Sequence, residues 1–174
     1  IKPDLITLGK YLGGGVSFGG FGGRSDIMEG FNPRSKDAWR HAGTFNNNIM
    51  TMTAGLAGIT QLFTPEACIE LNKKGDVFRA RLNKTIQERS LPIQVTGLGS
   101  MNNVHFTDIP MERPHTDPVS SRKGDLMHLD MLKLGVYHAR RGMMNLSLPM
   151  TDADIDFAVS AFEEFLDSRR AILK

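Results

Sequence analysis

Short apolar and glycine-rich runs dominate the first 30 residues of the chain. Residues 4–9 form a short apolar, β-prone run, which predicts a strand. Glycine is then the most frequent residue across residues 12–23. A short helix is expected at residues 25–29, because Ser25 or Asp26 can cap a helix that begins there.

Two helical patterns occupy the middle of the chain, after a polar loop at residues 31–40. The first pattern consists of apolar residues at helical spacing, namely Ile49, Met52, Leu56, Ile59 and Phe63. The second begins at Thr64 and Pro65, because Thr is a good N-cap and Pro fits the first helical position. Its apolar stripe consists of Leu71, Phe78, Leu82 and Ile86.

The pattern changes to strands after residue 91. Residues 93–100 predict a strand with a glycine break, and residues 103–106 predict its antiparallel return. Residues 107–124 are polar and rich in proline, which indicates a surface loop. A helix at residues 125–134 and a strand at residues 143–149 are expected to follow.

The last helix has the clearest signal. Thr151 serves as its N-cap, and acidic residues in its first turn suit the helix dipole. Its apolar face consists of Ile155, Ala158, Val159, Phe162, Phe165 and Leu166. Arg169 and Arg170 are expected to form a solvated helix end.

Taken together, these elements predict an α/β fold in two parts. Residues 1–65 are expected to finish a larger α/β domain, and residues 66–174 to form a small α/β domain. The chain begins at Ile1 and enters the first strand without a lead-in, so we expect a piece of a longer polypeptide, whose upstream half would act as its partner.

Composition narrows the class of protein. With 40% hydrophobic and 23% charged residues, the chain suits a globular protein with a real core. The net charge of +2 gives no footprint for nucleic acid. No apolar run approaches the roughly 20 residues of a membrane helix, and no signal peptide is evident, so a cytoplasmic location is the default expectation. A single cysteine, Cys68, excludes an internal disulfide and is expected to be a buried or half-buried helix thiol.

Lys10 stands at the end of the first strand, immediately before the glycines. A phosphate-binding P-loop has its lysine after the glycines, so the order of residues excludes that motif. A GxGxxG dinucleotide motif and an HExxH metal motif are also absent, and no metal site is expected. A Schiff-base lysine needs desolvation and room to move, and flanking glycines supply that room. The alternative is a surface lysine that ends a strand.

The segment around Lys10 resembles a known cofactor site. Residues 3–24 read PDLITLGKYLGGGVSFGGFGGR, which is similar to the pattern PDLxxxGKxxGGGxxxGxxGG around the lysine of class III aminotransferases. The resemblance continues through essentially the whole chain. It implies a fold-type I enzyme in which Lys10 holds pyridoxal 5'-phosphate (PLP) as a Schiff base and later moves a proton between substrate and cofactor.

A second matching segment, HAGTFNNN at residues 41–48, contains Thr44. Glutamate-1-semialdehyde aminomutases have a similar Gly-Thr segment, whereas the Phe-Asn-Asn-Asn continuation resembles aminotransferases of β-amino acids, the β-phenylalanine type. The resemblance implies that Thr44 contacts the cofactor phosphate of the neighbouring subunit in a homodimer, near a helix start that favours anions. Alternatively, Thr44 only caps that helix.

A third segment, Arg140-Arg141-Gly142 followed by LSLP at residues 146–149, also resembles the β-amino-acid group. The resemblance implies that Arg141 binds a substrate carboxylate, for which the planar guanidinium is suited. Arg140 is the second choice, and a surface arginine without a role is the alternative. Tyr137 and His138 lie nearby in the sequence without an assigned role.

These resemblances imply a PLP-dependent aminotransferase that moves an amino group from an amino acid, by preference a β-amino acid, to a 2-oxo acid. One alternative is a glutamate-1-semialdehyde 2,1-aminomutase. The alternative from another class is a catalytically silent fragment or assembly subunit. In the family, an Asp pairs with the pyridine nitrogen, an aromatic residue stacks on the ring and a Gly-Ser/Thr turn holds the phosphate, and all three lie upstream of the matching segment.

Overall fold

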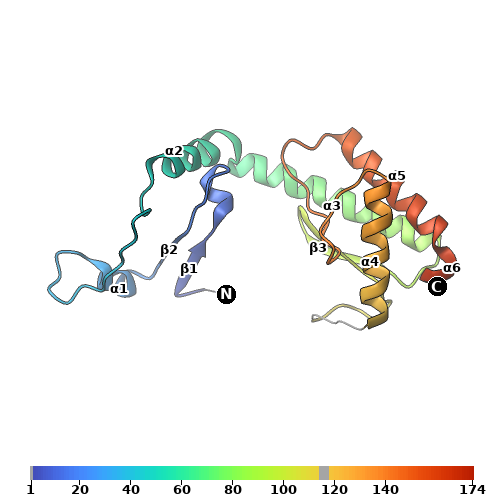
Figure 1. Ribbon diagram of the computed structural model, residues 1–174, viewed down its shortest axis with the longest axis horizontal. Coiled ribbons are helices and arrows are strands. Elements are labelled where there is room, and N and C mark those ends of the chain that lie inside the picture. The colour runs from blue at the N-terminus through green and yellow to red at the C-terminus, as the bar shows by residue number, and fades with distance from the viewer. Residues whose placement is uncertain (1, 114–117) are drawn as a thin grey trace. The chain divides into compact units, whose positions relative to one another are not determined.

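The computed structural model describes residues 2–113 and 118–174 of the chain. The chain divides into two compact units, residues 1–65 and residues 66–174, coloured blue to teal and green to red in Figure 1. Each unit is built from its own antiparallel hairpin and the helices that pack against it. No helix within the described ranges is both long enough and apolar enough to cross a bilayer.

The first unit begins with a hairpin whose strands are β1 (Leu5–Leu8) and β2 (Gly20–Gly23). Leu5 pairs with Gly23, and Leu8 pairs with Gly20. The other elements of this unit are the 3-10 turn η1 (Lys10–Gly13), α1 (Ser25–Met28), η2 (Glu29–Phe31), α2 (Ile49–Ala57) and the π-helical turn η3 (Gly58–Leu62). The predicted strand at residues 4–9 and helix at 25–29 are therefore confirmed.

Arg24 joins the hairpin to α1. Its guanidinium donates to the Asp4 carboxylate at 2.7 Å and also to Asp26, while its backbone N–H donates to the Asp4 carbonyl at 2.9 Å. Arg24 itself occupies the N-cap position of α1, and it makes no side-chain capping bond. The predicted cap at Ser25 or Asp26 is wrong because both residues already lie inside the helix.

Helix α2 turns small residues inward. Its buried positions are Thr51 and Gly55, whereas the apolar residues that predict the helix are exposed in this unit. Ile49 is 80% exposed and Leu56 is 61% exposed, so the apolar stripe identifies the helix without identifying its packed face.

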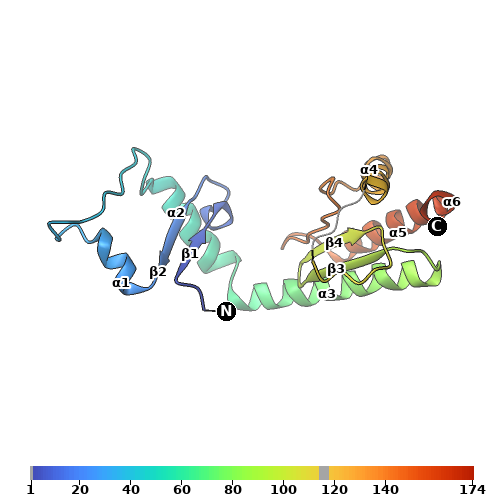
Figure 2. The ribbon, with the colours of Figure 1, turned by 90° about the horizontal axis from the view of Figure 1, so that it is seen from below.

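The second unit has a hairpin between helices. Its strands are β3 (Gln94–Leu98) and β4 (Met101–His105), and its helices are α3 (Pro65–Glu88), α4 (Pro118–Lys133), α5 (Asp152–Ser168) and α6 (Arg170–Leu173). Figure 2 shows the hairpin between α3 and α4. Asn83 of α3 fixes this packing, because its amide both donates to the Val95 carbonyl and accepts from the Val95 N–H, at 2.9 Å each.

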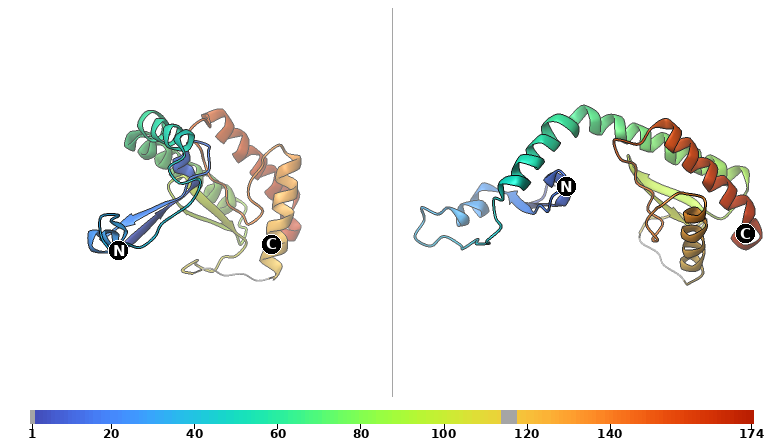
Figure 3. Two further views of the ribbon diagram at one scale, coloured as in Figure 1. Left: turned by 60° about the vertical axis from the view of Figure 1, so that its left-hand side comes forward. Right: turned by 45° about the horizontal axis from the view of Figure 1, so that its top comes forward.

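Helices α3 and α5 run side by side in the same direction (Figure 3). Three side-chain contacts join the two helices along their length: Arg81 to Asp156 at 2.7 Å, Thr85 to Glu163 at 3.1 Å and Arg89 to Asp167 at 2.7 Å. The predicted N-cap of α5 is confirmed, since Thr151 and Asp154 form a reciprocal capping box. Between these helices and the hairpin lies the core, which includes Phe78, Leu82, Ile86, Val95, Val104, Met127, Met131, Phe162, Phe165 and Leu166.

Two expected elements of the second unit differ from the structure. Helix α4 begins at Pro118, not at residue 125, so the predicted loop is too long at its C-terminal end; residues 114–117 of that loop lie outside the described residues. Proline is compatible with the first turn of a helix, and Lys123 donates to the Leu173 carbonyl at 3.1 Å, a tertiary contact that no local pattern reveals.

The predicted strand at residues 143–149 is instead an extended segment with a single bridge, between Asn103 and Met143. It still lies along the edge of β4 and its turn, because the N–H of Met144 donates to the Asn102 carbonyl at 2.9 Å and that of Leu146 to the Ser100 carbonyl at 3.0 Å. Cys68 is half-buried in α3, which confirms its expected environment.

Arg169 is not part of a solvated helix end. Its guanidinium donates two hydrogen bonds, of 2.6 and 3.0 Å, to the carboxylate of Asp130, a buried residue of α4. These bonds hold the pKa of Asp130 below its usual range. The pair therefore ties the C-terminal end of α5 to α4.

We expect Asp130→Asn to lower the urea midpoint of unfolding near neutral pH. The folded-state pKa of Asp130 is lowered. Its contribution to the free energy of unfolding is therefore complete above the unfolded carboxyl pKa of about 3.9, and it is lost as the pH falls through the folded-state pKa. The difference between wild type and variant should therefore shrink in acid. Asp156→Asn is the control, since its ion pair with Arg81 is exposed and contributes little. Equal midpoints for wild type and Asp130→Asn at pH 7 would contradict the expectation.

Candidate functional site

The main chain at Lys10 leaves strand β1 and enters the tight turn η1 (Lys10–Gly13). Two backbone hydrogen bonds define the turn and its continuation, from the N–H of Leu12 to the Gly9 carbonyl and from that of Val16 to the Gly13 carbonyl, both at 3.1 Å. Gly14 and Gly15 then adopt φ angles of 59° and 93°, a region that favours glycine. The glycine tract is thus a structural requirement of the turn.

Open space surrounds several of these glycines. A Cβ atom placed on Gly9 or Gly15 would meet no heavy atom of the described part of the chain within 4 Å, and the same holds for Gly19 and Gly22. Gly9 directly precedes Lys10, and it carries no side chain that would fill the space next to the main chain there. A glycine at this position fits the group that the sequence implies, a PLP ring that Lys10 would hold.

Thr44 lies in an exposed turn before helix α2. Among the residues that the structure describes, its hydroxyl has no hydrogen-bond partner, so it is free to donate to an anion. The helix is capped instead by Asn48, whose side-chain oxygen accepts from the N–H groups of Met50 at 3.0 Å and Thr51 at 3.2 Å. The alternative in which Thr44 caps the helix is therefore wrong.

An aromatic cluster of Phe21, Phe31, Trp39 and His41 organises the segment between β2 and Thr44. The ring centroids of Phe21 and Phe31, of Phe21 and His41, and of Phe31 and Trp39 are each 5.2 Å apart, all edge to face. This cluster ties the loop that leads to Thr44 back to strand β2. The sequence gives no warning of it, because the four rings share no helical or strand spacing.

Arg140 and Arg141 differ in the partners available to them. Arg140 donates two hydrogen bonds, of 2.6 and 2.8 Å, to the carboxylate of Asp125, and these bonds lower the pKa of Asp125. Arg141 is exposed, and its only side-chain hydrogen bond to a described residue runs from Nε to the sulfur of Met143, at 2.9 Å. A guanidinium without a carboxylate partner is the one available to a ligand, which favours Arg141 over Arg140.

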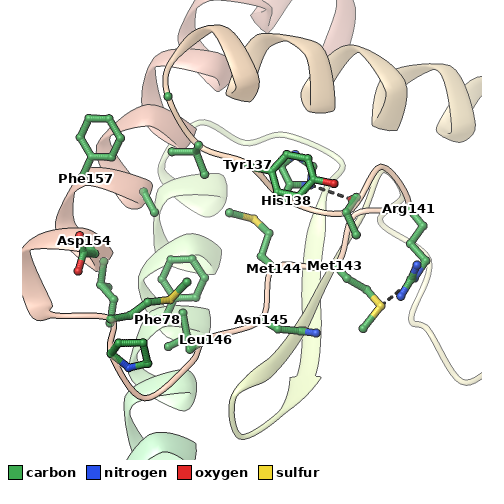
Figure 4. A pocket seen from close by; sticks show the side chains of 17 residues that line it. Phe78, Tyr137, His138, Arg141, Met143, Met144, Asn145, Leu146, Asp154 and Phe157 are labelled. Carbon is green, nitrogen blue, oxygen red and sulfur yellow. Dashed lines mark hydrogen bonds between the residues drawn. The ribbon is translucent and has the colours of Figure 1, made fainter. Parts of the chain in front are cut away.

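A hollow of about 560 Å³ adjoins Arg141 in the second unit. Figure 4 shows Arg141 and Met143 on one side of the view and Phe157 and Asp154, from α5, on the other. The lining of the hollow is mainly apolar and includes Phe78, Val136, Met144, Leu146, Pro149, Ile155, Phe157 and Ala158. An apolar hollow beside a cationic fork suits a ligand that has both a hydrocarbon part and a carboxylate.

Two histidines lie at or near this hollow. His138 is buried, and its Nδ1 is 2.9 Å from the Ala139 carbonyl; burial lowers the pKa of His138, so the ring is neutral near pH 7. Its ring centroid is 5.3 Å from that of His128. The ring-to-ring contacts of both histidines are packing contacts, because His128 meets the rings of Tyr137 and His138 edge to face.

The three residues predicted from the sequence fall into two groups. Lys10 and Thr44 belong to the first unit. Lys10 lies just before the glycine tract, and Thr44 lies between the aromatic cluster and helix α2. Arg141 belongs to the second unit, beside the apolar hollow. The residues predicted to hold the cofactor therefore lie in one unit, and the residue predicted to bind the substrate carboxylate lies in the other.

Comparison with known proteins identifies a family. The family model described as aminotransferase class-III matches residues 1–166. The chain is 47% identical over 175 aligned residues to the β-phenylalanine transaminase of Variovorax paradoxus, covering 99% of the chain and 40% of the relative. It is 34% identical to the glutamate-1-semialdehyde 2,1-aminomutase of Heliobacterium modesticaldum, covering 94% of the chain and 38% of that relative.

The solved structure of a β-phenylalanine aminotransferase from Variovorax paradoxus superposes on the chain with a TM-score of 0.89 and 45% identity. It covers 98% of the chain, and the chain covers 40% of that structure. The chain thus spans about 40% of the length of the relatives it matches. The mixed α/β architecture described above is a portion of that larger fold.

Proposed function

Because this chain belongs to the class III aminotransferases, a PLP-dependent family, we propose that it forms the lysine-bearing part of an enzyme that transfers an amino group from a β-amino acid to a 2-oxo acid. The observation that carries the proposal is the 47% identity to a β-phenylalanine transaminase over nearly the whole chain, with the Lys10 segment included. The rest of such an enzyme would come from an upstream half that precedes these residues.

Lys10 has the central role in this proposal. When bound, PLP supplies an aldehyde for covalent attachment and an electron-withdrawing ring. The Nζ atom of Lys10 would be the point of attachment, and as a free amine it would take a proton from the reacting substrate carbon and deliver it to the cofactor. The open space beside Gly9 supports this role, since the lysine must move between the two tasks.

Thr44 would bind the cofactor phosphate across a homodimer interface. Its hydroxyl can donate to a phosphate oxygen, and helix α2 begins five residues later, at Ile49, where the helix dipole favours negative charge. We infer that each active site takes its lysine from one subunit and Thr44 from the other, so that dimer formation completes the site.

Arg141 would bind the substrate carboxylate, with the apolar hollow next to it receiving the hydrocarbon side chain. Support comes from the guanidinium of Arg141, which has no carboxylate partner among the described residues, in contrast to the Arg140 pair with Asp125, and from the apolar lining of the hollow. This arrangement favours an aromatic or aliphatic β-amino acid over glutamate 1-semialdehyde, whose chain is short and polar. The lower identity to the aminomutase, 34% against 47%, points the same way.

The experiment supplies the full-length protein with PLP, 3-amino-3-phenylpropanoate and 2-oxoglutarate, and measures glutamate and the keto acid by chromatography. We expect both products in equal amounts. In Arg141→Gln, loss of the charge-assisted hydrogen bonds should raise KM for the β-amino acid roughly 10- to 100-fold. Arg140→Gln is the matched control, and its KM should stay near that of the wild type because Arg140 is already paired with Asp125.

Three other outcomes would each change the assignment. Formation of 5-aminolevulinate from glutamate 1-semialdehyde, without keto-acid product, would establish the aminomutase instead. Equal KM values for the two arginine variants would remove Arg141 from the substrate site. Absence of any PLP uptake by the full-length protein would favour a catalytically silent assembly subunit.

A further inference from the structure

Helix α2 and the turn after Lys10 approach each other more closely than side chains would allow. A Cβ atom on Gly55 would overlap the carbonyl oxygen of Leu12, and a Cβ atom on Gly14 would overlap that of Ala54. Thr51, which is 5% exposed, donates a hydrogen bond from its hydroxyl to the Ser17 carbonyl at 3.2 Å. The helix therefore contacts the main chain of the segment that carries Lys10 at Leu12, Gly14 and Ser17.

Thr51 and Gly55 lie one helical turn apart and share the inward face of α2. They are its two buried residues, and both contact backbone atoms of the lysine segment. The apolar stripe of the same helix points elsewhere, since Leu56 and Ile49 are exposed. The inward face is thus specialised for close backbone contact, with one directional hydrogen bond.

We propose that Thr51 and Gly55 are positioning residues, which hold the turn that begins at Lys10 in the geometry needed for cofactor attachment. This proposal rests on the proposed function, in which Lys10 holds PLP. Leu12 is two residues after Lys10 in the same 3-10 turn, so any displacement of its carbonyl moves the main chain from which Lys10 projects. A displacement of about 1 Å can reduce a rate 100-fold when reacting groups must be aligned.

The decisive comparison is Gly55→Ala against Gly58→Ala in the full-length protein. Both substitutions add one methyl group to the continuous helical segment of α2 and η3, and alanine has the higher helix propensity at both positions. Only Gly55→Ala meets the Leu12 carbonyl; a Cβ on Gly58 would have an ordinary contact of 3.6 Å with Gly14 Cα. We expect Gly55→Ala to lower kcat about 10- to 100-fold with little change in KM, and Gly58→Ala to match the wild type.

A measurement without PLP tests the same point independently of activity. Acetic anhydride acetylates free amines, and mass spectrometry of the Lys10 peptide gives the labelling rate at this one residue as a function of pH. We expect Gly55→Ala to change the rate or pH profile at Lys10, while labelling of Lys36, in the polar loop, stays unchanged in every variant. Gly58→Ala should have the wild-type profile at both lysines.

Thr51 provides a second pair of variants in case Gly55→Ala does not fold. Thr51→Val keeps the shape of the side chain and removes the donor to Ser17, whereas Thr51→Ser keeps the donor. We expect a several-fold loss of kcat in Thr51→Val and recovery in Thr51→Ser. A role in stability alone would lower the melting temperature without a change in the Lys10 labelling profile.

The outcomes separate the two proposals. If the wild type attaches PLP at Lys10 and the Gly55 and Thr51 variants match it in kcat and in Lys10 labelling, the positioning role is wrong and the proposed function stands. If the wild type attaches no PLP, the proposed function fails. Unchanged Lys10 labelling across all the variants overturns the positioning role in either case.

Discussion

Lys10→Ala is expected to abolish covalent PLP attachment in the full-length protein and to lower transamination by at least about 10²- to 10⁴-fold, the usual contribution of a positioned acid–base group. Alanine lacks both the nucleophilic amine and the group that carries the proton. Attachment is measured by borohydride reduction followed by mass spectrometry of the peptide that spans residues 2–24. The wild type should gain the mass of the reduced cofactor at Lys10, and the variant should not.

Two further variants make this result specific. Lys10→Arg keeps a long cationic side chain, but a guanidinium stays protonated at any pH the protein tolerates and cannot attack an aldehyde. It should therefore be as inactive as Lys10→Ala, which separates the chemistry of the amine from its charge. Lys36→Ala, in the polar loop of the same unit, should retain attachment and activity. Cofactor attachment at another lysine in Lys10→Ala would show that Lys10 is not the attachment site.

Local signals in the sequence were enough to predict the elements that depend on local physics. Helix α5 is defined by a cap at Thr151 and an apolar face at helical spacing, and both are present in the structure. The start of α3 at Pro65 and the β3–β4 hairpin follow from similarly local rules of capping and glycine turns. These features need no knowledge of the rest of the molecule.

Features that depend on distant partners could not be predicted in this way. The early start of α4 is stabilised by a bond from Lys123 to the Leu173 carbonyl, 50 residues away. The inward face of α2 is chosen by the backbone of the lysine segment, so that Thr51 and Gly55 are buried in preference to the apolar stripe. Arg140 and Arg141 are neighbours in sequence, and only the position of Asp125 in space shows that the guanidinium of Arg140 already has a carboxylate partner.

The same reasoning applies to the candidate site. The roles predicted for Lys10, Thr44 and Arg141 came from resemblance. The structure adds that the Thr44 hydroxyl and the Arg141 guanidinium have no carboxylate or backbone partner among the described residues. The aromatic cluster around Phe31 and the α2 contacts came only from the structure. Residues that support a site are harder to find in a sequence than residues that perform its chemistry, because their partners are backbone atoms or rings without a motif.

Phe162→Ala is expected to produce the largest loss of stability among single substitutions in the second unit. Phe162 lies in α5 with 0% exposure, and its ring centroid is 6.1 Å from that of Phe165 in the core between α3, α5 and the hairpin. Truncation removes the buried ring and leaves a cavity, which costs about 3–5 kcal/mol in comparable cores. The free energy of unfolding, measured in urea, should fall by this amount.

Phe157→Ala is the matched control for that measurement, because it makes the same chemical change on the same helix at a position that is 55% exposed. Most of its ring already contacts solvent, so the loss should be well below half of that for Phe162→Ala. The contrast tests where the core lies more sharply than either variant alone. Equal losses of stability in the two variants would mean that the ring of Phe157 is covered in the full-length protein, which would narrow the hollow beside Arg141. A small loss for Phe162→Ala would contradict the core described above.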